Sequence, residues 1–189
     1  MPIKPSDEED RYFQAEGEAA LHKFKKELER KTTEELTKEA QQEAIANLGF
    51  TEDTVRILDL TPLVQMAWAD GSVSDQEKEL IDRVMEKRGV KKGDRAYDLM
   101  HEFLNRRPTD AFFDAAITLI KKMYDALPEN KKGRAEKDLV EFCVEVADAS
   151  GGIFGFNRIE SDERKELKKI IESLGAQKTD DLQKLLKGV

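Results

Sequence analysis

The chain has 189 residues and lacks the features that define several large protein classes. A single cysteine, Cys143, excludes an intramolecular disulfide and a zinc site built from several cysteines. No apolar run approaches the ~20 residues that a membrane-spanning helix needs. Charge begins too early at the amino terminus for a signal peptide. We therefore expect a cytoplasmic protein with a reduced thiol and no transmembrane segment.

Basic residues are also in the minority. The chain has 32 Lys and Arg against 40 Asp and Glu, which gives a net charge of −8 and a pI near 5.0. A nucleic-acid-binding protein needs a basic face, and no stretch here combines Lys or Arg with interleaved aromatic residues. No nucleic-acid partner is expected. Because charged residues make up 38% of the chain, we expect a modest core under a densely charged surface.

No segment shows the alternating pattern of a strand, whereas apolar residues recur at helical spacing along most of the chain. The pattern predicts an all-α fold. Helices are expected at about 6–30, 32–48, 51–58, 61–69, 74–89, 94–105, 109–127, 135–149, 161–174 and 180–186, with a turn-rich loop at 128–133. The helix at 109–127 is the most apolar and is expected at the centre.

Composition divides the chain into three parts. Residues 1–48 consist mostly of charged residues, Ala and Gln, and predict a helical extension that docks on the rest of the chain or binds a partner. Residues 49–178 carry most of the apolar positions and predict the main helical domain. Residues 179–189 predict a short carboxyl-terminal helix.

The segment 63–81 predicts a helix, a tight turn at Asp70 and Gly71, and a second helix capped by Ser74. A weaker copy follows, with Asp148 standing 78 residues after Asp70. We interpret the two segments as a duplicated helical hairpin whose halves are related by approximate two-fold symmetry.

The second helices of the two copies match in detail. Gly89 follows Glu77 by 12 residues, and Gly175 follows Glu163 by the same number. The copies differ in the connection between their helices. Asp70 precedes Glu77 by 7 residues, whereas Asp148 precedes Glu163 by 15. The longer connection contains a glycine-rich stretch at 150–157.

The segment 69–77, together with Ala147, Asp148 and the downstream Glu163, resembles the TerB-like (tellurite-resistance TerB) domain family. The resemblance covers about residues 50–175. It implies an all-helical domain with internal pseudo-symmetry, acidic positions proposed to form a cation site, and a link to tellurite and to general metal or chemical stress. The second copy departs from the family pattern, because Ala149 and the glycine insertion stand in place of a second Asp-Gly turn.

Four carboxylates are the candidate metal ligands: Asp70, Glu77, Asp148 and Glu163. Each aspartate is expected at the carboxyl end of a helix, where the helix dipole disfavours a negative charge, so a hydrogen bond, a basic neighbour or a bound cation should offset it. One reading is that the four converge and hold a divalent cation, and the other is that they are separate turn and cap residues. The loop lacks the acidic spacing of an EF-hand, so calcium binding of that kind is not predicted.

The glycine-rich stretch lacks the Gly-Lys-Ser/Thr of a phosphate-binding loop and follows no strand. Its apolar residues Ile153, Phe154 and Phe156 predict a loop that packs against the domain, or an external contact with a protein partner or a membrane surface.

No Ser/His/Asp or Cys/His set occurs at a recognisable spacing. His22 and His101 are expected to face solvent, Trp68 to pack in the core, and Cys143 to act as a small buried hydrophobe. The chain is interpreted as a non-enzymatic TerB-like stress-response protein that binds or scaffolds a protein partner, with a divalent cation as its one candidate cofactor. The alternatives are a metal-dependent enzyme that uses the same carboxylates and a pure protein-interaction module. The sequence leaves the oligomeric state open.

Overall fold

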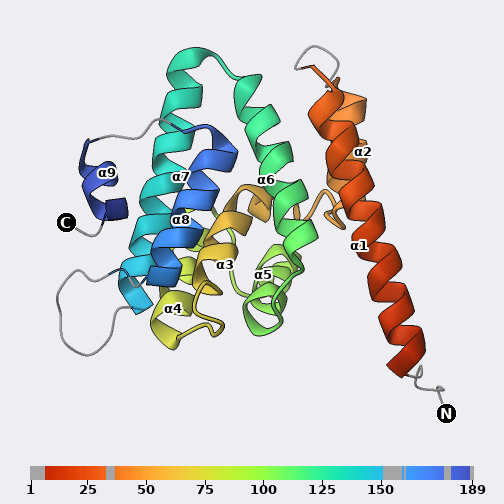
Figure 1. Ribbon diagram of the computed structural model, residues 1–189, viewed down its shortest axis with the longest axis horizontal. Coiled ribbons are helices and arrows are strands. Elements are labelled where there is room, and N and C mark those ends of the chain that lie inside the picture. The colour runs from red at the N-terminus through yellow and green to blue at the C-terminus, as the bar shows by residue number, and fades with distance from the viewer. Residues whose placement is uncertain (1–6, 33–36, 151–158, 160, 177–179, 188–189) are drawn as a thin grey trace.

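Figure 1 presents the computed structural model, which describes residues 7–32, 37–150, 159, 161–176 and 180–187. Within these ranges every regular element is a helix and no strand occurs, so the prediction of an all-α fold is confirmed. The elements are α1 (Asp7–Arg30), α2 (Lys38–Asn47), the 3-10 helix η1 (Val55–Leu60), α3 (Thr61–Ala67), α4 (Asp75–Lys87), α5 (Arg95–Asn105), α6 (Asp110–Asp125), α7 (Glu129–Ser150), α8 (Ser161–Leu174) and α9 (Asp180–Lys187).

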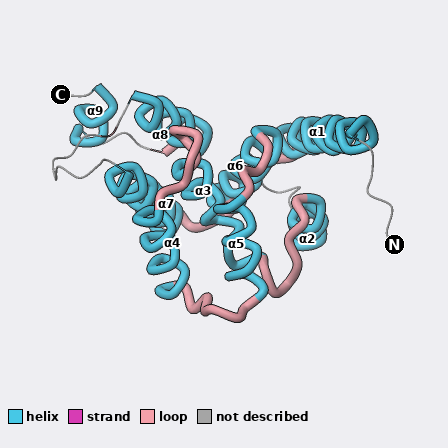
Figure 2. Tube along the Cα trace, turned by 90° about the horizontal axis from the view of Figure 1, so that it is seen from below, coloured by secondary structure: helices cyan, strands magenta, loops and turns pink. Residues whose placement is uncertain are grey.

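Helix α6 is the centre of the molecule, as its apolar sequence predicts. It packs against α1, α3, α7, α8 and η1, and Figure 2 shows it between α1 and α3. Its buried positions recur every three or four residues, which is the spacing of one broad helix face. They are Ala111, Phe112, Phe113, Ala115, Ala116, Ile117, Leu119, Ile120 and Tyr124.

The predicted stop signals at the ends of α4 and α8 act as expected. Gly89 has φ of 76° and Gly175 has φ of 72°, a left-handed conformation that residues with a side chain adopt only with strain. The residue after each glycine donates its N–H to the carbonyl five residues earlier, at 2.9 Å in α4 and 3.2 Å in α8. The two helices therefore end in the same Schellman arrangement.

Three predicted boundaries are wrong. The helix expected at 51–58 is the 3-10 helix η1, which begins at Val55 and ends at Leu60. The stretch 128–133 was expected to be a loop, but α7 begins at Glu129, directly after Pro128. Proline suits a position just before or at the first helical turn, and Gly133 lies inside the helix instead of ending it. Helix α2 begins at Lys38 and not after Thr32, because the Oγ1 of Thr37 caps it by accepting the Ala40 N–H at 3.3 Å.

The carboxyl half of α1 packs on α6, whereas its amino-terminal part projects beyond the other helices (Figures 1 and 2). Leu28 is buried in this contact. The Nζ of Lys25 lies 3.4 Å from the Oδ2 of Asp114, and the Nζ of Lys122 donates to the carbonyl of Lys31 at 2.5 Å. The extension thus docks on the main body through a narrow face. The division of the chain at residues 48 and 178 stays a prediction.

We call α3 and α4, with the turn that joins them, the first hairpin, and α7 and α8 the second hairpin. Helix α3 packs against α7, α4 packs against α7, and α8 packs against α3. An axis that exchanged the two hairpins would produce this set of contacts. The duplication of the hairpin itself stays a prediction.

Candidate functional site

The turn of the first hairpin is closed by the side chain of Asp70. Its Oδ1 accepts the backbone N–H of Ser72 at 2.9 Å and lies 3.3 Å from the Ser72 hydroxyl. These bonds form an Asx turn, which offsets the unfavourable position of a carboxylate at a helix carboxyl end. Gly71 completes the turn with φ of 94°. Asp70 itself is exposed.

Helix α4 starts with the predicted capping box. The Oγ of Ser74 accepts the Glu77 N–H at 3.2 Å, and the Oε2 of Glu77 accepts the Ser74 N–H at 2.7 Å and its hydroxyl at 2.8 Å. Unlike most capping glutamates, Glu77 is only 2% exposed. The sequence predicts the cap but not the burial, which depends on α4 packing against α7.

Burial raises the pKa of Glu77, while the hydrogen bonds from Ser74 oppose this shift. The charge of Asp70 raises the pKa of Glu77 further. The first hairpin thus brings two carboxylates close enough to repel each other. A cation between them would relieve this repulsion.

The second hairpin holds the other two predicted ligands with the same exposure as the first. Glu163 is 2% exposed in the first turn of α8, which matches the burial of Glu77. Asp148 is exposed near the carboxyl end of α7. The carboxyl end of α7, the amino end of α8 and the α3–α4 turn lie toward the same end of the molecule in Figure 1.

No cluster of three or more His, Cys, Asp or Glu side chains suited to a metal ion occurs in the described part of the chain. Asp70 is the carboxylate of this pair that a cation keeping most of its water, as Mg²⁺ usually does, could reach, whereas Glu77 is only 2% exposed. A site made by all four carboxylates stays a prediction.

The aromatic and histidine positions are partly as predicted. Trp68 packs against the core, and its indole N–H donates to the carbonyl of Phe103 at 2.9 Å. His22 is exposed, as expected. The expectation for His101 is wrong, because its Nε2 lies 2.8 Å from the Oδ1 of Asp82 and its ring stacks on Tyr97 with 4.3 Å between the centroids. This contact joins α4 to α5, and nothing in the local sequence predicts it.

Cys143 is fully buried in α7, as predicted. Burial raises the pKa of its thiol to about 12, so the thiolate that would act as nucleophile is suppressed at neutral pH.

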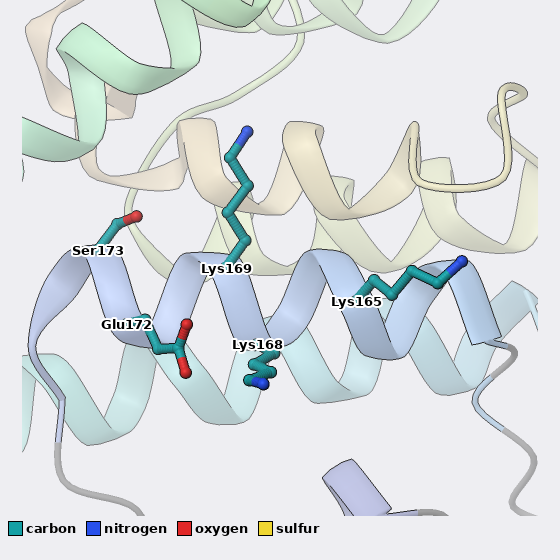
Figure 3. A pocket seen from close by; sticks show the side chains of 5 residues that line it. All are labelled: Lys165, Lys168, Lys169, Glu172 and Ser173. Atoms are coloured by element: carbon teal, nitrogen blue, oxygen red, sulfur yellow. The ribbon is translucent and has the colours of Figure 1, made fainter.

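A shallow hollow runs along α8 and is lined by Lys165, Lys168, Lys169, Glu172 and Ser173 (Figure 3). All five side chains come from one helix, and they project in different directions without converging. The Nζ of Lys169 lies 3.6 Å from the Oδ1 of Asp114, and the Nζ of Lys165 lies 2.7 Å from the Oδ1 of Asp162. Because these lysines already have acidic partners, the hollow is not a candidate anion site.

Two sequence predictions concern segments that span or contact membranes. The residues Ile153, Phe154 and Phe156 lie outside the described residues, so their predicted contact stays a prediction. Among the helices that are described, none is both long enough and apolar enough to cross a bilayer.

The fold and the site define a class of protein: in its described residues it is a small all-helical domain in which α4 and α8 each carry a buried glutamate in the first turn. The family model described as "Tellurite resistance protein TerB" matches residues 56–184, and the chain belongs to this family. No curated protein and no solved structure shows a significant match to the chain.

Proposed function

We propose that the chain is a cytoplasmic, non-enzymatic binding or scaffold protein of the tellurite-resistance response. The observation that carries this proposal is the family match over residues 56–184, which includes both hairpins. The one cysteine supports a role other than thiol chemistry on tellurite, because it is buried and its pKa is raised to about 12.

A growth assay tests this function. A host strain that lacks the chain should grow less well in tellurite than its parent, and the full-length chain supplied in trans should restore growth. A change in tolerance to an unrelated antibiotic is the control for a general growth defect. Equal growth of the two strains across a tellurite series would contradict the proposal.

A divalent cation bound at Asp70 and Glu77 is the sharper form of the proposal. Its support is the charge of Asp70, which adds to the larger effect of burial in raising the pKa of Glu77. A metal-dependent enzyme that uses the same carboxylates is the alternative. Spectroscopy of bound Mn²⁺ distinguishes the two. In an enzyme, a substrate would occupy coordination positions of the ion and change the spectrum, whereas in a binding module no substrate would replace its ligands.

A further inference from the structure

A groove of about 700 Å³ lies between α7 and α9, along the face of α7 that α9 does not cover. Its apolar part comes from both helices and from the residue after Gly175: Val140, Val144, Ala176, Leu182 and Leu185. Val140 and Leu182 are buried, whereas the other three are half-buried and contribute accessible apolar surface.

The rim of the groove is acidic. Four glutamates and one lysine line it: Glu129, Glu136, Glu141, Glu145 and Lys137. Glu136 lies 3.9 Å from the Nζ of Lys132 and Glu141 lies 3.5 Å from that of Lys137. Within the described residues Glu129 and Glu145 form no ion pair, and both are exposed. The groove therefore combines an apolar floor with an excess of negative charge.

At Gly133 the backbone of α7 is open to the groove, because this residue has no side chain to cover it. This glycine lies in the interior of α7, where glycine destabilises a helix relative to alanine. A Cβ at this position would meet no atom within 4 Å, so packing inside the chain does not require a glycine. A second helix that crosses α7 at short distance would require one, because a larger residue would hold the two backbones apart.

The dimensions also suit a helix. From Glu129 to Glu145 the lining follows one face of α7 over 16 residues, which is about 24 Å of helix. A partner helix of similar length would place apolar residues at i, i+3, i+4 and i+7 on the floor and its polar residues against the rim.

We propose that this groove binds a basic amphipathic helix of a protein partner. The inference rests on the proposed function, since it names the chemistry of the partner that the binding module takes. Charge complementarity favours a basic helix over a second copy of this chain, whose net charge is −8 and whose groove would meet another acidic rim.

The test is a fluorescence titration of the full chain with three labelled 16-residue peptides. One carries leucines at helical spacing with lysines elsewhere, one has the same composition in scrambled order, and one replaces each lysine by glutamate. The amphipathic lysine peptide should bind at least about tenfold more tightly than either control, and added salt should weaken it.

Two variants localise the binding. Gly133→Leu should keep or raise the melting temperature, since a Cβ there meets open space, and should weaken the lysine peptide about tenfold or more. Glu145→Lys should weaken it several-fold, whereas Glu102→Lys on α5 makes the same change in net charge at an exposed position outside the groove and should have a smaller effect.

Three results would overturn the inference: equal binding of the ordered and scrambled lysine peptides, unchanged affinity in both groove variants, or a dimer of the chain that Gly133→Leu dissociates. The growth assay separates this failure from that of the proposed function. If Gly133→Leu restores tellurite tolerance as fully as the wild type does, the groove is not needed for tolerance and only the inference about the groove fails. If the wild type itself gives no tolerance, the proposed function fails and the peptide result still stands.

Discussion

The second helices of the two hairpins are alike at both ends, whereas the connections that precede them differ in length. Glu77 and Glu163 are both 2% exposed, and Gly89 and Gly175 end their helices with the same pair of backbone bonds. The first hairpin joins its helices through a tight turn that couples Asp70 to Glu77. The comparison teaches that packing against a shared core preserves both ends of the second helix, whereas the connection before it is free to vary in length.

The largest expected effect concerns the equivalent core positions Ile81 and Leu167, which are both 0% exposed. Replacing either by alanine should lower the free energy of unfolding by about 2–5 kcal/mol, because it removes buried methyl groups and leaves a cavity. Urea denaturation measures the change. A loss below about 1 kcal/mol at one position and not at the other would mean that the hairpins do not share one core.

Next come the two helix-ending glycines. Gly89→Ala and Gly175→Ala should each cost about 1–2 kcal/mol, since alanine is strained at positive φ. A Cβ at residue 175 would lie 3.5 Å from the Cε of Lys121, an ordinary contact, and at residue 89 it would meet open space. The two costs should therefore agree within a few tenths of a kcal/mol in thermal unfolding. A neutral substitution at either site would contradict the matched ends.

A smaller loss is expected for Ser74→Ala, which removes the side-chain acceptor at the amino end of α4. The cost should be about 1 kcal/mol, and Ser74→Thr should retain most of the stability because threonine keeps the hydroxyl that accepts the Glu77 N–H and donates to its carboxylate. Chemical denaturation of the three proteins side by side measures it. No difference between the alanine and threonine variants would contradict the capping box.

The smallest expected stability effect is a change in pH dependence at Glu77. Because burial raises the pKa of this carboxyl, the folded state binds more protons than the unfolded state between the ordinary pKa and the raised value. The contribution of Glu77 to the free energy of unfolding is therefore fully present below this pH window. The free energy of unfolding falls as pH rises through the window. Glu77→Gln keeps an oxygen acceptor for the Ser74 N–H and should remove this fall. Melting curves from pH 4 to 8 measure the difference, and identical slopes in the two proteins would contradict the shift.

The parts of the fold that depend on local pattern were predictable from the sequence. Apolar spacing identified α6 as the centre, and the serine and glycine signals identified both ends of α4. The start of α7 was not predictable from the sequence. Proline and glycine, which stand here at Pro128 and Gly133, occur in loops as well as at helix starts and in helix interiors. Local sequence does not decide which of these contexts applies.

Contacts between distant residues were not predictable. The bond from Trp68 to the Phe103 carbonyl joins residues 35 positions apart, and the contact of His101 with Asp82 joins residues 19 positions apart. Only the packing of η1, α3, α4 and α5 brings these groups together. The same limit applies to the candidate site, where the sequence identified Asp70 and Glu77 but not the burial that raises the pKa of Glu77.

The central proposal is that Asp70 and Glu77, at the turn of the first hairpin, bind a divalent cation. Thermal unfolding with Ca²⁺, Mg²⁺, Mn²⁺ and Zn²⁺ tests it in the wild type, in Asp70→Asn and in Asp75→Asn, an exposed neighbour that serves as the matched control. Asparagine keeps the Asx turn, so neither variant should unfold.

The account predicts that at least one cation, at about tenfold above its Kd, raises the melting temperature of the wild type and of Asp75→Asn by about 3–6 °C and leaves Asp70→Asn unchanged. No rise with any of the four cations, or a rise that survives in Asp70→Asn, would contradict it.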